Sequence, residues 1–297
     1  MRLVITRPAG DAASWVNALQ AAGHEALVLP LIDIAPVADL QAVQQAWAQW
    51  PDFHAVMFVS AQAVRYFFDS QPVALRVDAC QAMRPDGASG PRFWATGPGT
   101  RKALLNAGIP AARIDSPPED EAQFDSEALW RVVASQVQAL TLSESVAPRQ
   151  GLTSEQVAAS SGLSAPPAVL IVRGSDEGAS AEQAKGGSGR DWLTQQLQAC
   201  GVTVSWVAAY ARSVPVWTPA HRQQATQAAT DGSVWCFSSS QAVTHLQQLL
   251  PAQNWATARC IATHARIAQT AQVLGFGEVH TARPLVADVV ASLESLA

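Results

Sequence analysis

The stretch FVSAQAV at residues 58–64 returns later in the chain as FSSSQAV at residues 237–243. Each copy joins an apolar, strand-like run to a helical pattern. Two further pairs of segments recur in the same order: VITRP with LIVRG, and ATGPGT with ATHARI. Strand–helix junctions that repeat in order indicate an internal duplication, in which one structural half is built twice.

The alternation of short apolar runs with amphipathic stretches continues along the chain and predicts parallel α/β sheets. Strands are expected at RLVIT (2–6), HAVMFVS (54–60) and AVLIVR (168–173), and helical patterns follow them. Two stretches lack a clear period. Residues 141–165 are rich in Ser, Ala and Gln, and residues 174–189 are rich in Gly and Ser, so both are predicted to be mobile surface segments.

Length, charge and composition restrict the possible functions. The chain has 297 residues, which is room for two domains, and its formal net charge is −5. Without a basic stripe, nucleic acid is not an expected partner. No apolar run approaches the roughly 20 residues that span a bilayer, and no secretory pattern is seen at the start. The four cysteines have no C-x-x-C spacing, so no metal site is expected. A cytoplasmic protein without a membrane partner is predicted.

The order and spacing of several short motifs resemble those of the uroporphyrinogen-III synthase family. These motifs are TRP (6–8), PLIDIAP (30–36), FVSAQAV, ATGPGT (95–100), LIVRG (170–174), AAYARSVP (208–215) and FSSSQAV. Each motif is loose by itself, and their common order makes the resemblance specific. It covers nearly the whole chain, and only the two stretches without a period look like insertions.

The resemblance implies a fold of two similar parallel-sheet α/β domains that are interlaced and joined by a two-stranded hinge. Residues 1–33 together with 213–297 would form the first domain, and residues 37–207 would form the second. The chain would cross between them at 34–37 and again at 208–212. Periodicity alone does not predict this interlacing.

The resemblance also implies a substrate and a reaction. The substrate would be hydroxymethylbilane, a linear tetrapyrrole with several carboxylates, which loses water and closes to a macrocycle with its terminal ring inverted. The family uses no metal and no organic cofactor, and the chain has neither a Walker A lysine nor a G-x-G-x-x-G motif. A monomer is expected, with transient contact to hydroxymethylbilane synthase, the enzyme that supplies the unstable bilane.

A protein of net charge −5 needs local sites to bind a polyanion, and helix N-termini are such sites. By resemblance, ligand contacts of this type fall at the strand-to-helix junctions, on Ser60, Ala61, Gly97, Thr100, Ser239 and Ser240. The alternative is that the serines only cap their helices. A mere tight turn is likewise the alternative for the glycine.

One histidine and two arginines are further candidates for carboxylate binding. In the second repeat His264 stands where the first has Gly97. This histidine could donate to a carboxylate, or it could be a solvated side chain at a helix start. Arg7 and Arg173 follow matching strands, and each could hold a carboxylate with two hydrogen bonds. The alternative for each arginine is a salt bridge within the protein or a solvated strand end.

Tyr210 lies in the segment VAAYARSVP, where the second crossing is expected. The resemblance suggests that it helps the hydroxyl group leave the terminal ring, as a hydrogen-bond donor or weak acid. The alternative is a hinge tyrosine that packs against one domain and hydrogen-bonds to the other.

A rival function from a different class remains open at this point. Two α/β lobes also describe a cytosolic binding protein for a small anion, without catalysis. Such a binder would show a dissociation constant without turnover, whereas a synthase must convert the bilane.

Overall fold

The computed structural model describes residues 1–72, 90–121, 123–145, 166–176 and 188–296. Within these ranges the chain forms two compact units. The first unit comprises Met1–Ala35 and Arg212–Ala297, and the second comprises Pro36–Ala211. Both units are α/β structures built on mostly parallel sheets, which confirms the predicted fold class.

The first unit contains a five-stranded sheet in the order β11-β10-β9-β1-β2, and all of its pairings are parallel. The early part of the chain supplies β1 (Arg2–Ile5), α1 (Ala9–Ala21) and β2 (Glu25–Val28). The late part supplies α8 (Pro219–Ala228), β9 (Val234–Phe237), α9 (Ser240–Leu249), β10 (Arg259–Ala262), α10 (Ala265–Leu274), β11 (Glu278–Thr281) and α11 (Val286–Glu294). Segments more than 200 residues apart therefore share one sheet, with β1 beside β9.

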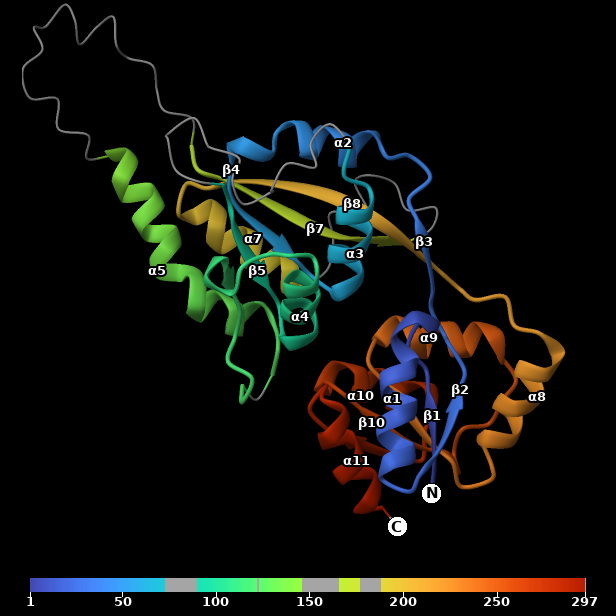
Figure 1. Ribbon diagram of the computed structural model, residues 1–297. Coiled ribbons are helices and arrows are strands. Elements are labelled where there is room, and N and C mark those ends of the chain that lie inside the picture. Colours follow the sequence, from blue (N-terminus) through green and yellow to red (C-terminus); the bar gives the residue numbers. More distant parts are fainter. Residues whose placement is uncertain (73–89, 122, 146–165, 177–187, 297) are drawn as a thin grey trace, which may run out of the picture. The chain divides into compact units, whose positions relative to one another are not determined.

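The two faces of this sheet are buried by different helices. Leu3 and Ile5 pack on one side with residues of α1 and α11. Val4, which points to the opposite side, packs with residues of α8, α9 and α10. Leu3, Val4 and Ile5 alternate between the two faces and are all buried, because helices cover both faces (Figure 1).

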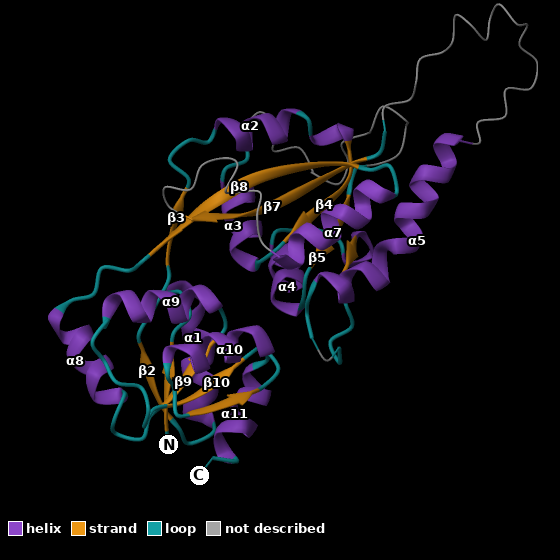
Figure 2. Ribbon diagram, turned by 180° about the vertical axis from the view of Figure 1, so that it is seen from behind, coloured by secondary structure: helices purple, strands orange, loops and turns teal. Residues whose placement is uncertain are grey.

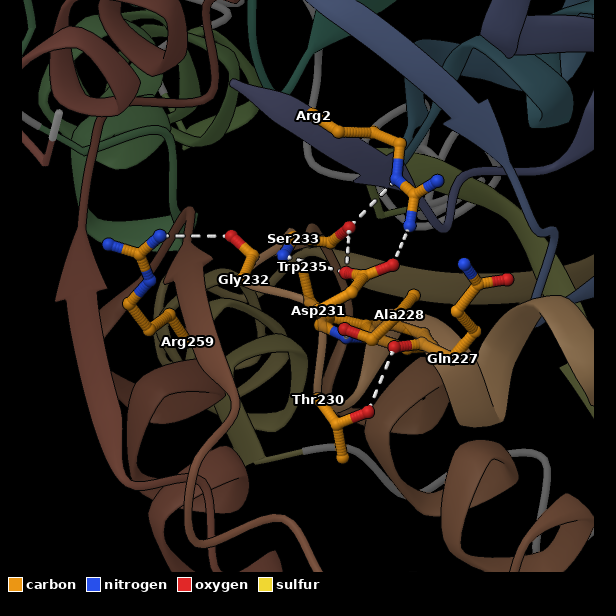
Figure 3. A network of polar contacts seen from close by, with 9 residues as sticks. All are labelled: Arg2, Gln227, Ala228, Thr230, Asp231, Gly232, Ser233, Trp235 and Arg259. Carbon is orange, nitrogen blue, oxygen red and sulfur yellow. Dashed lines mark hydrogen bonds and ion pairs between the residues drawn. The ribbon is translucent and has the colours of Figure 1, made fainter.

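Polar contacts join the amino-terminal ends of the strands in the same sheet (Figure 3). Arg2 at the start of β1 forms an ion pair with Asp231 and donates to the Ser233 hydroxyl at 2.8 Å. That hydroxyl donates in turn to Asp231 at 2.6 Å, and Arg259 donates to the Gly232 carbonyl at 2.9 Å. Side chains therefore hold the loop before β9 to the starts of β1 and β10.

The second unit contains a six-stranded sheet in the order β3-β8-β7-β4-β5-β6. Its elements are β3 (Asp33–Pro36), α2 (Gln41–Ala48), η1 (Trp50–Asp52), β4 (Phe53–Phe58), α3 (Ala61–Asp69), β5 (Arg92–Ala95), α4 (Pro98–Asn106), η3 (Ala111–Arg113), β6 (Ile114–Asp115), α5 (Ser126–Ser145), β7 (Ala168–Asp176), α7 (Ser188–Ala199) and β8 (Thr203–Ser213). The boundaries between the two units fall inside β3 and β8, after Ala35 and Ala211.

Helices cover both faces of this sheet as well (Figure 2). On one face Met57 and Ile171 pack with residues of α5 and α7. The opposite face carries a cluster of aromatic rings, in which Trp47 stacks on Trp50 and Phe67 with centroid distances of 4.7 and 4.5 Å. Such offset aromatic contacts add stability beyond the area that they bury.

The two sheets repeat the same order of corresponding elements. The order β10-β9-β1-β2 in the first unit matches β5-β4-β7-β8 in the second. Strand β1 pairs with β9 as β7 pairs with β4, in parallel in both cases. The three recurring sequence segments therefore lie at three corresponding strand–helix junctions.

The ends of the two stretches that were predicted to be mobile belong to regular elements. Helix α5 continues to Ser145, so the beginning of 141–165 is helical, and residues 146–165 lie outside the described part of the chain. Strand β7 continues to Asp176 and α7 begins at Ser188, which leaves 177–187 outside that part. Gly174, assigned to the second stretch by composition, is a strand residue.

Candidate functional site

The carboxyl edge of the second sheet brings two predicted junctions together. Ser60 is the N-cap of α3, and its hydroxyl accepts from the Ala63 N–H at 3.1 Å. Gly97 is the N-cap of α4, which begins with proline. The Thr96 hydroxyl donates to the Val59 carbonyl at 3.3 Å and so connects the end of β5 to the end of β4. Two helix N-termini therefore start side by side.

The first turn of a helix presents amide donors that can bind an anion. The first amide groups of a helix have no partner within the helix, and the Ser60 hydroxyl satisfies only that of Ala63. The amides at the start of α3, beginning with Ala61, are not satisfied by this cap. The partial positive charge at such a terminus favours negative groups.

Gly97 and Thr100 also have structural partners. A Cβ atom at Gly97 would lie 3.1 Å from the Cβ of Phe124, so the missing side chain makes room for that ring. Thr100 is buried, with its hydroxyl 3.5 Å from that of Thr96. Its side chain therefore belongs to the packing behind the N-terminus of α4.

Tyr210 reaches the same edge from β8. Its side chain is only 5% exposed, and its hydroxyl lies 3.1 Å from that of Ser60. The ring stacks on Tyr66 with a centroid distance of 5.9 Å and an interplanar angle of 29°. The guanidinium of Arg65 lies 4.7 Å from the Tyr66 ring centre. The phenol group thus lies between an aromatic ring and a helix N-terminus, and the positive charge of Arg65 packs on that ring.

Sequence reasoning missed the residue that lies under this tyrosine. A Cβ atom at Gly174 would be 2.4 Å from two carbons of the Tyr210 ring and 2.9 Å from its hydroxyl oxygen. The only signal in the sequence is that LIVRG ends in glycine where VITRP ends in proline. Composition alone placed this glycine in a surface segment.

Arg173 is placed inside the second unit. It is 3% exposed, and its guanidinium lies 4.7 Å from the centre of the Trp206 ring. Its position within β7 is next to the β4 junction, since the Val59 amide donates to the Val172 carbonyl at 3.2 Å. Its guanidinium therefore packs against an aromatic ring of the same unit.

The first unit builds a similar edge from β9 and β10. Ser239 is the N-cap of α9 and accepts from the Gln241 N–H at 3.2 Å. His264 is the N-cap of α10, and its Nδ1 accepts from the Arg266 N–H at 3.1 Å. Because Nδ1 is an acceptor, the Nε2 of the neutral ring carries the proton and can donate away from the helix.

The Nε of Arg7 and the hydroxyl oxygen of Ser240 are among the polar atoms of the first unit that are buried without a hydrogen-bond partner in the described part of the chain. Arg7 follows β1, and its guanidinium lies 5.0 Å from the Trp15 ring centre. Buried polar groups usually bind a partner, which can be a water molecule or a ligand group.

The buried thiols of the first unit are not nucleophiles. Burial raises the pKa of Cys236 to about 12, although the charge of Arg7 opposes the shift. Burial and the neighbouring Cys236 raise the pKa of Cys260 to about 12. Both remain protonated at neutral pH.

Within the described ranges, no three His, Cys, Asp or Glu side chains form a group that could hold a metal ion.

The predicted site residues thus fall into two sets. The second unit holds Ser60, Ala61, Gly97, Thr100, Arg173 and Tyr210. The first unit holds Arg7, Ser239, Ser240 and His264. In each set the residues lie at or next to the carboxyl ends of parallel strands, where α/β proteins bind their ligands. Across the described helices, none is both long and apolar enough to cross a membrane.

Comparisons with known proteins identify the family and agree with the fold. The family model of uroporphyrinogen-III synthase HemD matches residues 13–291. A crystal structure of a mutant uroporphyrinogen III synthase from Thermus thermophilus is similar, at 14% identity and a TM-score of 0.51, over 100% of this chain and 98% of that one. Uroporphyrinogen-III synthetase from Helicobacter pylori is similar at 13% identity and a TM-score of 0.50, over 100% of both chains. No curated protein sequence matches the chain.

Proposed function

Because the chain belongs to the uroporphyrinogen-III synthase family of cyclising lyases, we propose that the residues at the carboxyl edges of its two sheets convert hydroxymethylbilane into uroporphyrinogen III. The reaction is a step of tetrapyrrole and haem biosynthesis. The observation that carries the assignment of residues is the contact between the Tyr210 and Ser60 hydroxyls beside the N-terminus of α3. This contact supports the proposal that the phenol acts as a proton donor beside a helix N-terminus.

The carboxylates of the bilane are bound by local groups rather than by net charge, which is −5. In the second unit the amides at the starts of α3 and α4 receive them. In the first unit the starts of α9 and α10 do so, together with the Nε of Arg7 and the hydroxyl of Ser240, which have no hydrogen-bond partner among the described residues. His264 adds a donor through Nε2, in place of the glycine that the other repeat has there.

Tyr210 assists the first bond cleavage. The Ser60 oxygen already accepts from the Ala63 amide, and its own proton can be donated to the Tyr210 oxygen. The phenol proton is then directed to the hydroxymethyl group on the terminal ring opposite ring D, and its hydroxyl departs as water. The pyrrole nitrogen supplies the electron pair, which leaves an azafulvenium cation. Negative charge left on the phenol oxygen is stabilised by the Ser60 hydrogen bond and by the terminus of α3.

The later steps depend on how the protein holds the linear bilane. The substituted carbon of ring D attacks the azafulvenium carbon and forms a spiro intermediate. This intermediate fragments and closes again with ring D inverted, and loss of a proton from carbon restores the aromatic pyrrole. That proton balances the one given to the leaving water. Attack at the unsubstituted carbon would give the type I isomer, so fixing the carboxylates decides the product.

We further propose a cytoplasmic monomer that receives the bilane in transient contact with hydroxymethylbilane synthase. The support is chemical, since a bilane that closes spontaneously to the type I isomer must be captured soon after its release. Size-exclusion chromatography of the two enzymes, alone and with substrate, tests the monomeric state and the contact.

The isomer ratio of the product tests the function. Hydroxymethylbilane is generated in situ, the protein is added, and the oxidised products are separated into type I and type III uroporphyrin. A type III fraction that rises with protein concentration supports the proposal. Type I alone, formed at the spontaneous rate with folded protein, would overturn it and leave a two-lobed anion binder.

A further inference from the structure

We propose that Gly174 is a positioning residue for Tyr210, because only a residue without a side chain lets the phenol ring lie over β7 with its hydroxyl at Ser60. The inference rests on the proposed function, since it concerns the tyrosine assigned to the leaving hydroxyl. It adds a residue that touches no substrate and acts through the ring above it.

The space for the ring exists only because Gly174 has no Cβ. A Cβ atom there would lie 2.4 Å from the Cε2 and Cζ atoms of Tyr210, far inside van der Waals contact. The backbone of Gly174 is not in the left-handed region, so a substituted residue would not be strained by its own φ angle. The ring is therefore the obstacle to a side chain at this position.

The ring has little freedom to move away. Tyr66 stacks on it, Ser60 holds its hydroxyl at 3.1 Å, and the Ser175 hydroxyl contacts its backbone carbonyl at 3.5 Å. A Cβ at Gly174 would force the ring to retreat by about 1 Å before ordinary contact is reached. Such a shift is enough to break the contact between the two hydroxyl groups.

The internal repeat supports a link between the two positions. In the first unit Pro8 stands where the second has Gly174, since both follow the matching arginine. Ile32 stands where the second has Tyr210, nine residues after the turn glycine in both repeats. The glycine and the large ring thus occur together in one repeat, and neither occurs in the other.

A double-mutant cycle of Gly174→Ala and Tyr210→Ala tests the packing relationship by thermal unfolding. Gly174→Ala is expected to lower Tm, and the loss should disappear in the Tyr210→Ala background, where no ring meets the new Cβ. Gly277→Ala is the matched control, because its Cβ would lie 1.9 Å from the Ala256 carbonyl oxygen. Its loss of stability should be the same in both backgrounds. Independent losses for Gly174→Ala would overturn the proposal.

Kinetics of the same four proteins test the role in the reaction. Gly174→Ala should lower kcat for the type III product by about 100-fold, because misplacing a reacting group by about 1 Å has effects of this size. KM should change less than about threefold, since no substrate contact is removed. In the Tyr210→Ala background the same substitution should have no further effect on kcat.

Two kinetic outcomes separate the hypotheses. An unchanged kcat in Gly174→Ala, or losses that multiply in the double variant, would overturn the positioning role. A wild-type protein that forms no type III isomer would instead overturn the proposed function. In that case the unfolding cycle would still show whether the glycine and the ring are coupled.

Discussion

The hydroxyl oxygens of Ser60 and Tyr210 lie 3.1 Å apart, although 150 positions separate the two residues in the chain. The same serine oxygen accepts from the Ala63 amide at the start of α3. One side chain therefore joins a helix N-terminus to the phenol group. Capping and a role at the site are not alternatives here, because a hydroxyl group can accept one hydrogen bond and take part in another.

Replacing Ser60 should separate these two roles. Ser60→Ala is expected to lose about 1 kcal/mol of stability from the missing cap. It should also lower kcat for the type III isomer, since Tyr210 loses its partner. Thr218→Ala is the matched control, because Thr218 caps α8 in the same way and lies outside the site. The control should lose similar stability and keep its activity, and equal kinetic effects in both variants would contradict the role given to Ser60.

The buried thiols predict a fall in stability at alkaline pH. The pKa of Cys236 and that of Cys260 are each raised from 9.0 to about 12 in the folded protein. The unfolded chain therefore loses these protons first, and the stability that is full below pH 9 is lost as the pH rises toward 12. The slope should be about 1.4 kcal/mol per pH unit for each thiol.

Unfolding in denaturant at several pH values between 9 and 12 would measure this slope. Combined Cys236→Ala and Cys260→Ala substitutions should remove most of it. Cys200→Ala, at a partly exposed thiol, is the control and should leave the slope unchanged. A double variant with the wild-type slope would show that other groups cause the alkaline loss.

Asp231, in the network at the amino ends of the first sheet's strands, should make the stability of the folded protein depend on pH in the acid range. Burial alone would raise the pKa of Asp231, but hydrogen bonds from Ser233 and the charge of Arg2 outweigh it and lower the pKa below 3.8. Stability from this carboxylate is therefore present above pH 3.8 and is lost as the pH falls through the lowered value. Asp231→Asn should reduce stability at neutral pH and weaken its dependence on acid pH.

The control for this network is Asp120→Asn, which removes an exposed carboxylate in a turn. Thermal unfolding between about pH 2 and about pH 7 would compare the two variants. If both had the same pH dependence as the wild type, Asp231 would not be a source of acid-sensitive stability.

Local patterns in the sequence were sufficient to predict much of the fold. The strand expected at 54–60 is β4 at Phe53–Phe58, and the one expected at 168–173 begins β7. The junction residues are helix caps as well, because capping depends on residues next to each other in the chain. Apolar runs and caps are properties of short segments and can be read without the tertiary structure.

The packing around the site could not be predicted in this way. Gly174 and Tyr210 meet because β7 and β8 are neighbours in the sheet, and nothing near Gly174 in the sequence marks the ring above it. Nothing near Arg173 in the sequence predicts that its guanidinium lies over Trp206. Contacts of this type are fixed by sheet order and not by local pattern.

The most direct test of the proposed mechanism is the isomer-resolved initial rate of Tyr210→Phe. This variant keeps the ring that stacks on Tyr66 and fills the space over Gly174, and it removes only the hydroxyl group. We expect kcat for the type III isomer to fall by about 100-fold, as for the loss of a proton donor, with KM nearly unchanged and type III still the enzymatic product. A folded Tyr210→Phe protein with the wild-type kcat would contradict the assignment of Tyr210 as the group that assists the leaving hydroxyl.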